Sequence, residues 1–218
     1  MSGASQRSSD GRSDLLLIRH GEAPPGPDGD DPDQPLSEEG ERQARAVATR
    51  LTGVPFDRLV TSPVVRARRT ADVIAAACGI EVEVDEDFRE FAVPDYAAQT
   101  AAEVSVRLRT GTWDGWTGED PGAFATRVRR GIERLAIPDS VTVVTCHGGL
   151  INAVLAAVFG GSFRLGLYLE NTAITHLLVH PDGHWELAGV NDAHHLGDRL
   201  AVPGYTLDEA LLRFSPAG

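Results

Sequence analysis

The sequence predicts an α/β fold in which a mostly parallel central sheet is flanked by helices on both faces. Short apolar runs, suited to strands buried on both faces, alternate along the chain with longer helical patterns. Three of these runs end in a polar residue, namely His20, Ser62 and His147. In an open α/β sheet, residues just beyond the carboxyl ends of the strands gather in one crevice. We therefore expect these three residues to converge.

The first half of the chain contains three expected strands and two expected helices. The strands are expected at 15–18, 59–61 and 82–84. The helices are expected at 37–51 and 63–78. Ser37 is suited to cap the first helix, Pro63 to occupy the first turn of the second, and Gly79 to end it. Residues 23–35 are crowded with Pro, Gly and Asp and are interpreted as a loop.

The second half continues the alternation after a weaker stretch between residues 88 and 118. Helices are expected at 98–108, 118–136 and 150–159, and strands at 141–145, 173–179 and 185–190. The run 141–145 is the strongest strand pattern in the chain. The last two strands alternate in polarity on either side of a Pro-Asp-Gly turn, which is typical of a pair of neighbouring strands.

Length and composition limit the architecture and the partners. The 218 residues are interpreted as a disordered lead-in at 1–13, one α/β domain at 14–200 and a tail at 201–218. The formal net charge of -12 disfavours nucleic acid and anionic membranes as partners. No apolar stretch approaches the ~20 residues of a membrane span. Two cysteines, Cys78 and Cys146, cannot form a disulfide framework, which favours a cytoplasmic location.

The first motif with chemical content is Arg19-His20-Gly21-Glu22, at the end of the first strand. A neutral imidazole can attack phosphorus, and an adjacent guanidinium can neutralise a phosphate with paired hydrogen bonds. Gly21 allows a sharp turn and a close approach to a ligand. An isolated histidine in this position would more often be a structural residue, so the interpretation depends on the segments that follow.

Two later segments would bring further phosphate ligands to the same crevice. Arg66 lies one turn into a helix that begins at the end of a strand, and its side chain can reach back to the crevice. Arg68 and Arg69 are interpreted as surface residues. His147 follows the strongest strand and precedes two glycines and a helix, so it is interpreted as another phosphate contact.

Together these segments resemble the histidine phosphatase superfamily, also called the phosphoglycerate mutase-like superfamily. The resemblance covers residues 15 to about 196. It rests on Leu17-Ile-Arg-His-Gly-Glu22, Leu36-Ser-Glu-Glu-Gly40 with Gln43-Ala44, Ser62-Pro63 with Arg66-Ala67 and Thr70-Ala71, His147-Gly-Gly149, Asn171-Thr172, and Asn191-Asp192 with His195-Leu196. These matches occur in the family's order and at compatible spacing.

The resemblance implies the fold and the site. His20 would accept the phosphoryl group, while Arg19, Arg66 and His147 would hold the phosphate. Glu90 matches the family's proton donor. The family pattern usually continues with a glycine and Trp-Glu-Gly, whereas here Phe91-Ala-Val-Pro-Asp95 follows. Three neighbouring carboxylates therefore stay as rivals for the acid role: Asp85, Glu86 and Asp87.

Other residues near these motifs receive supporting roles. Glu22 is expected to support the turn through hydrogen bonds. Four aromatic residues of the variable segment would form either a substrate-facing wall or ordinary core: Phe91, Tyr96, Trp113 and Trp116.

The predicted activity is that of a histidine acid phosphatase-type phosphomonoesterase that needs no metal or other cofactor. Its partners would be a small phosphorylated substrate or inorganic phosphate, and a homodimer is left open. Sugar phosphates, phosphoglycerates, nucleotides and phosphoproteins all fit as substrates. Two alternatives within the family are a phosphoglycerate mutase-type phosphoryl transferase and a weakly active member that acts by binding a protein. Against the mutase, residues 23–30 lack the Asn and Trp residues of the cofactor-dependent mutases.

Two unrelated hydrolase chemistries fit the sequence poorly. A cysteine phosphatase would need an arginine six positions after its nucleophile, and Asn152 stands in that position relative to Cys146. A metallohydrolase would need a ligand cluster, and His184, His194 and His195 match no common zinc spacing.

Overall fold

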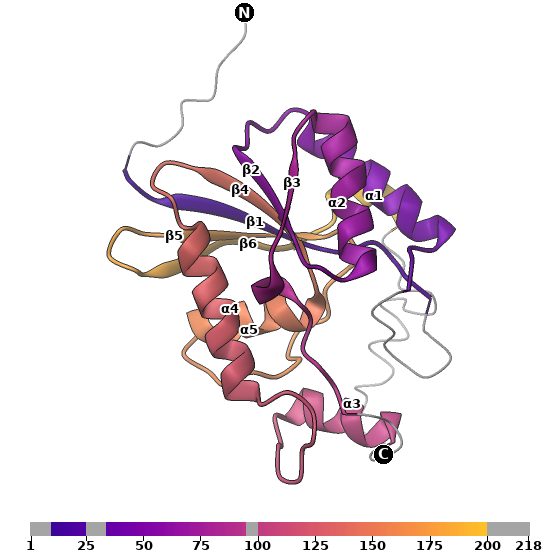
Figure 1. Cartoon of the computed structure of the whole chain (residues 1–218), viewed down its shortest axis with the longest axis vertical. Helices are drawn as coiled ribbons and strands as arrows, with labels where there is room; N and C mark the ends of the chain where they lie inside the picture. The colour runs from indigo at the N-terminus through magenta and orange to yellow at the C-terminus, as the bar shows by residue number, and fades with distance from the viewer. Residues whose placement is uncertain (1–9, 25–33, 95–99, 200–218) are drawn as a thin grey trace, which may run out of the picture.

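The computed structural model describes residues 10–24, 34–94 and 100–199 (Figure 1). Its six strands are β1 (Ser13–Arg19), β2 (Arg58–Thr61), β3 (Val82–Val84), β4 (Val141–Cys146), β5 (Ile174–Val179) and β6 (Trp185–Asp192). Its α-helices are α1 (Glu38–Leu51), α2 (Val65–Cys78), α3 (Ala101–Thr110), α4 (Pro121–Leu135) and α5 (Gly148–Val158). Two 3₁₀ helices, η1 (Glu86–Phe88) and η2 (His194–Arg199), complete the described elements.

All six strands join one sheet in the order β3-β2-β4-β1-β5-β6. The first four in this order are parallel, and β5 runs antiparallel to both β1 and β6. The mostly parallel sheet predicted from the sequence is confirmed. As a result, the carboxyl ends of β2, β4 and β1 lie side by side at one edge of the sheet.

Helices cover both faces of the sheet, as predicted (Figure 1). In this view α1 and α2 lie on one side of the strands, and α4 and α5 lie on the other. Strand β1 contributes side chains to the hydrophobic core on both faces of the sheet, because successive side chains of a strand point to opposite faces. Its Leu15 and Leu17 join the core beneath α4 and α5, while Ile18 joins the core beneath α1 and α2.

The predicted helix ends are confirmed at α1 and at the end of α2. The Ser37 hydroxyl accepts a hydrogen bond from the amide of Gly40, which caps α1. Gly79 follows α2 with a φ of 68°, a left-handed conformation that glycine adopts without steric cost.

Several predicted helix starts are wrong by a few residues, each because of local backbone geometry. Helix α2 begins at Val65 and not at Pro63, since Val64 keeps an extended conformation as the N-cap. Helix α4 begins at Pro121, where the Asp120 carboxylate caps the amide of Ala123, and not at Gly118. Helix α5 begins two residues earlier than predicted, so that His147 is its N-cap.

Helix α3 is also displaced from its predicted range. The sequence pattern predicts 98–108, whereas the helix spans Ala101–Thr110, because Thr100 forms a capping box with Glu103.

The ordered chain also starts earlier than predicted. The amide of Gly11 donates to the Asp139 carboxylate at 2.9 Å, and the carbonyl of Arg12 accepts from the amide of Asp139. Residues 10–13 thus belong with the fold and not with a disordered lead-in. The rest of the predicted lead-in, residues 1–9, and the whole predicted tail lie outside the described residues. No helix in the described ranges has the length and apolar character needed to cross a bilayer.

Candidate active site

Three polar residues follow three neighbouring parallel strands. The register pairs Arg19 with Cys146 and Thr61 with Thr145, so β1, β4 and β2 end level with one another. The ladder continues one step beyond the strands, because the amide of His20 donates to the Cys146 carbonyl at 2.9 Å. The convergence of His20, Ser62 and His147 that was predicted from strand ends is therefore observed.

The side chains of the three segments meet in a buried cluster. The rings of His20 and His147 stand edge to face with their centroids 5.1 Å apart. The guanidinium Nε of Arg66 donates to Nε2 of His20 at 3.0 Å. His147 Nε2 lies 2.8 Å from the Ser62 hydroxyl. His20, His147 and Arg66 are all buried, which removes bulk water from the cluster.

Hydrogen bonds define the protonation state of His20. A guanidinium can only donate, so Nε2 of His20 must present its lone pair to Arg66. Nδ1 lies 2.7 Å from the Gly21 carbonyl, which can only accept, so the proton resides on Nδ1. Burial, followed by the charges of Arg19 and Arg66, holds the pKa of His20 well below its ordinary 6.5. His20 is thus a neutral imidazole whose Nε2 lone pair faces a cation.

Unpaired polar atoms mark the place of an anion in this cluster. Nδ1 of His147 and Nε of Arg19 are buried without a hydrogen-bond partner. Burial, then the proximity of the second titratable ring, His20, and the charge of Arg66, keeps the pKa of His147 well below 6.5. The N-terminus of α5 begins beside His147 and adds the positive end of a helix dipole. A tetrahedral oxyanion would supply an acceptor to Nε of Arg19, and to Nδ1 of His147 when that nitrogen carries the proton.

The backbone around His20 is fixed by contacts from distant segments. The Thr70 hydroxyl accepts from the amide of Gly21 at 3.0 Å, and the Asn171 side-chain amide donates to the His20 carbonyl at 2.9 Å. A Cβ on Gly21 would lie 2.6 Å from the carbonyl oxygen of Gly40, so only glycine fits this close approach. These contacts fix the backbone from which the His20 side chain projects.

Glu90 lies at the edge of the cluster. Its carboxylate accepts from the amide of Gly149 at 3.0 Å and from the amide of Phe91 at 2.8 Å. A Cβ on Gly149 would lie 2.4 Å from Glu90 Oε1, so the glycine leaves room for the carboxylate beside the second histidine motif. The structure therefore brings Glu90 into contact with a residue only two positions from His147.

The three rival carboxylates point toward arginines instead. Asp87 pairs with Arg130 and, at 2.8 Å, with Arg134, and Asp85 also pairs with Arg134. Glu86 is mostly exposed and pairs with Arg89 at 2.8 Å. The pairs of Asp85 and Asp87 fasten the segment that precedes Glu90 to α4.

Arg127 is a site-supporting residue that the sequence analysis did not single out. Its Nη1 donates to the carbonyls of Asp87 at 2.9 Å and Arg89 at 2.8 Å. Its other nitrogens pair with the Glu119 carboxylate. No sequence pattern indicates this contact, because Arg127 and Arg89 are 38 positions apart and meet only through the packing of α4.

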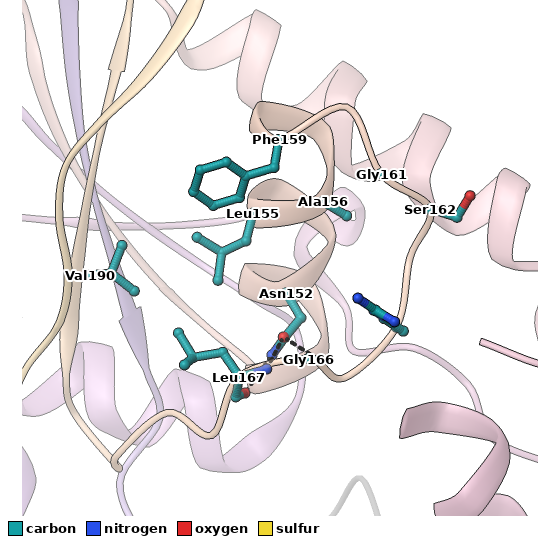
Figure 2. Close-up of a pocket in the computed structure, with 10 residues that line it drawn as sticks. Asn152, Leu155, Ala156, Phe159, Gly161, Ser162, Gly166, Leu167 and Val190 are labelled. Atoms are coloured by element: carbon teal, nitrogen blue, oxygen red, sulfur yellow. Dashed lines mark hydrogen bonds between the residues drawn. The ribbon is translucent and has the colours of Figure 1, made fainter. Parts of the chain in front are cut away.

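Asn152 fixes a second loop near the site (Figure 2). Its amide donates to the carbonyls of Gly148 and Leu167, and its carbonyl accepts from the amides of Gly166 and Leu167. The side chain of this buried asparagine uses all four of its hydrogen bonds, and three of them join α5 to the loop 159–170. On the outer side of this loop is an apolar cavity of about 440 Å³, which Phe159 and Val190 help to line.

The other residues that the sequence analysis interpreted can be placed as well. Arg69 pairs with Glu41 at 2.6 Å at the surface, as expected. Glu22 supports the turn, since its carboxylate accepts from the Ser37 hydroxyl at 2.8 Å. Phe91, Trp113 and Trp116 pack with one another in the core, whereas Tyr96 lies outside the described residues.

Neither unrelated hydrolase chemistry finds support in the described part of the chain. Burial, followed by the nearby Glu90 charge, raises the pKa of the Cys146 thiol, which opposes a thiolate nucleophile. His195 binds the Thr172 hydroxyl and lies beside Arg50. Across the described residues, no three His, Cys, Asp or Glu side chains are grouped so as to hold a metal.

Comparisons with known proteins agree with this geometry. Residues 15–193 match the sequence profile of the histidine phosphatase superfamily (branch 1). A probable phosphoglycerate mutase GpmB from Serratia proteamaculans (strain 568) is 33% identical over 170 residues, which cover 72% of this chain and 79% of the relative. The uncharacterized phosphatase PhoE of Bacillus subtilis (strain 168) is 27% identical over 167 residues, which cover 75% of this chain and 85% of the relative.

A solved structure is also similar. A mycobacterial glucosyl-3-phosphoglycerate phosphatase in complex with VO3 superposes with a TM-score of 0.65 and 28% identity, covering 82% of this chain and 99% of the other.

Proposed function

This chain belongs to the histidine phosphatase superfamily, and from that premise we propose that it is a phosphomonoester hydrolase that works through a phosphohistidine on His20. One observation carries the proposal. A buried, neutral His20 presents the lone pair of Nε2 to Arg66, beside two buried nitrogens without a hydrogen-bond partner, Nε of Arg19 and Nδ1 of His147. This arrangement suits a nucleophile that faces a phosphate dianion.

In the first half of the reaction, the phosphate takes the place of the contact between Arg66 and His20. Arg19, Arg66 and His147 bind its equatorial oxygens and neutralise charge that grows in the transition state. Nε2 of His20 attacks phosphorus, and the bond between phosphorus and the ester oxygen breaks. Glu90, in its protonated form, gives its proton to the departing alkoxide, which leaves as an alcohol.

In the second half, water replaces the alcohol. Glu90, now a carboxylate, takes a proton from the water as its oxygen attacks phosphorus. The bond between Nε2 and phosphorus breaks, which regenerates neutral His20 and releases inorganic phosphate. The Gly21 carbonyl keeps the proton on Nδ1 throughout, so the leaving nitrogen departs without a further proton transfer. No step requires a metal.

A phosphoglycerate mutase is the second candidate, because the Serratia relative carries that name. A mutase shares the bond-breaking residues but must keep water from the phosphoenzyme and bind the carboxylate of phosphoglycerate. Hydrolysis is favoured here because residues 23–30 depart from the cofactor-dependent mutases. A role in protein binding alone is disfavoured by the complete set of His20, Arg19, Arg66 and His147.

The proposed ligands are a small phosphorylated substrate and inorganic phosphate. The mycobacterial relative binds VO3, an analogue of the phosphoryl group, and the donors assembled here suit the same ligand class. A homodimer, a cytoplasmic location and a single domain over 14–200 stay predictions.

The phosphohistidine tests the proposal directly. The enzyme is mixed with a ³²P-labelled aryl phosphate, in the presence of a chelator, and quenched within milliseconds. We expect an adduct that is labile in acid and stable in alkali, and peptide mapping should assign it to His20. The His147→Ala variant serves as a control, since it keeps the acceptor. An adduct on Cys146, or a complete lack of adduct in an active enzyme, would overturn the mechanism.

A further inference from the structure

A second cavity lies on the inner side of the loop 159–170, next to Glu90. Its volume is about 220 Å³. Glu90 lines it together with Gly149, which is two positions from His147, and five apolar side chains form its walls: Phe91, Val93, Leu108, Phe163 and Leu165. These walls come from three separate segments of the chain.

The position of this cavity identifies what it would hold. A proton donor must lie within hydrogen-bond reach of the oxygen that it protonates. If Glu90 protonates the leaving alkoxide, the rest of the leaving group lies on the Glu90 side of the phosphorus. The cavity begins at that carboxylate, so the leaving group would extend into it.

The charge of the lining opposes a carboxylated leaving group. Of the described residues that line the cavity, Glu90 alone carries a charge, and it is acidic. On α4, Arg127 is committed to Glu119 and to two backbone carbonyls. Arg164 lines the cavity on the opposite side of the loop. A substrate carboxylate placed here would lose its hydration without gaining a cation.

The walls are held rigid before any ligand enters. The ring of Phe91 packs 4.8 Å from that of Phe163 and stacks 5.6 Å from that of Trp116. The amide of Leu165 donates to the Leu108 carbonyl at 2.7 Å, which ties the loop to α3. A preformed apolar site binds an apolar group without a large ordering cost. An apolar cavity of about 150 Å³ already admits benzene.

Part of this wall lies in a segment that departs from the pattern of the family. Phe91 and Val93 belong to the segment Phe91-Ala-Val-Pro-Asp95, which departs from the family pattern after the acid. The backbone of this segment is fixed because the Ala92 carbonyl accepts from the amide of Glu119 at 2.8 Å. A Cβ on Gly118 would lie 2.5 Å from the same carbonyl oxygen, so glycine permits this packing.

We propose that this cavity is the leaving-group subsite and that it accepts an uncharged apolar group of about the size of a phenyl ring. The proposal rests on the proposed phosphatase function and narrows its substrate class. Preferred substrates are phosphomonoesters of apolar alcohols, and carboxylated esters such as phosphoglycerate are poor substrates.

The test compares alkyl phosphates whose alcohols differ in polarity and charge more than in leaving ability. These are benzyl phosphate, glycerol 3-phosphate and 3-phosphoglycerate. We expect kcat/KM for benzyl phosphate to exceed that for 3-phosphoglycerate by at least about tenfold. A preference for 3-phosphoglycerate, with the His20 adduct intact, overturns the subsite and leaves the phosphatase. Failure of all three substrates to react overturns both proposals.

A pair of variants on the loop 159–170 tests whether the inner cavity causes the preference for benzyl phosphate. Leu165→Ala opens the proposed subsite, and Leu167→Ala is its matched control, because Leu167 faces the outer cavity and is 42% exposed. Leu165→Ala should lower kcat/KM for benzyl phosphate about tenfold and that for glycerol 3-phosphate less than about twofold. Leu167→Ala should change neither. An equal loss on both substrates in Leu165→Ala, with an unchanged Tm, would place the apolar subsite elsewhere.

Discussion

The two halves of the candidate site are built in different ways. The phosphate half consists of His20, Arg66 and His147, which stand within a few residues of the ends of neighbouring parallel strands. The leaving-group half consists of Glu90 and the walls of the inner cavity, drawn from two loops and α3. The first half inherits its geometry from the sheet, whereas the second depends on how separate segments pack. One half can therefore support a reaction while the other selects its substrate.

Replacing the proposed nucleophile should have the largest effect and would abolish the function of the phosphate half. His20→Ala is expected to lower kcat by at least about 10⁴-fold, because the other groups can bind phosphate but cannot accept it. The fold should persist, since the backbone of His20 is held by Cys146 and Asn171. Steady-state turnover and circular dichroism check both statements. Near-normal turnover in this variant would exclude His20 as the acceptor.

Replacing the proton donor should have the next largest effect, and only on some substrates. Glu90→Gln keeps the shape of the side chain but removes its acid–base function. Alkyl phosphates should slow by about 10²–10³-fold, and aryl phosphates much less, because a phenolate departs without full protonation. Glu86→Gln is the matched control, because Glu86 is mostly exposed and pairs with Arg89 at the surface. Equal slowing of alkyl and aryl substrates would move the acid role away from Glu90.

Replacing Arg127 should have a smaller effect on turnover, because Arg127 supports the segment that carries Glu90. Arg127→Gln removes the donors to the carbonyls of Asp87 and Arg89, just before Glu90. Loss of this support should lower kcat on alkyl phosphates about tenfold, with a smaller change on aryl phosphates. Arg129→Gln is the control, since Arg129 pairs at the surface with Glu133. A fall in Tm with an unchanged ratio of alkyl to aryl rates would show that Arg127 only stabilises the fold.

The smallest expected effect is a dependence of stability on pH in the ligand-free enzyme. Burial holds the pKa of His20 and His147 well below 6.5, and burial followed by the Arg50 charge lowers the pKa of His195 to about 4. Below pH 6.5 these histidines take up protons in the unfolded chain but stay neutral in the folded chain. Their contribution to the free energy of unfolding is therefore full above pH 6.5 and is lost as the pH drops toward 4. Calorimetry without phosphate should show Tm about 5 °C lower at pH 5.5 than at pH 7.5. An unchanged or higher Tm at pH 5.5 would contradict the neutral state of these histidines.

The phosphate half could be predicted from the sequence because its signals are local. A buried apolar run is followed directly by Arg19-His20 in one segment and by Cys146-His147 in another. Each short stretch predicts both the strand and the polar residue at its end. The mostly parallel direction of the strands then follows general rules of α/β folds, whereas the order of the strands in the sheet comes from the structure. The helix starts were less predictable, as at Val65 and Pro121, because the conformation of one capping residue decides them.

The leaving-group half could not be predicted in the same way. Glu90 was selected over its neighbours by resemblance, and its contact with Gly149 joins two residues that are 59 positions apart in the chain. Nothing near Arg127 in the chain indicates that it binds the carbonyls before Glu90. Phe163 and Leu165 alternate with Arg164 along an extended loop, but which side of that loop faces the acid depends on the bonds of Asn152.

By itself the sequence determined the α/β architecture, the polar residues at three strand ends and the order in which they occur. Local patterns suffice for this, since strand burial and the turn that follows are short-range properties. Only the tertiary structure decided that His20 is neutral, that Asp85 and Asp87 turn toward arginines, and that an apolar cavity opens beside Glu90. Burial, the proximity of charges and the shape of a cavity all depend on residues from distant parts of the chain. They therefore cannot be predicted from any single stretch of sequence.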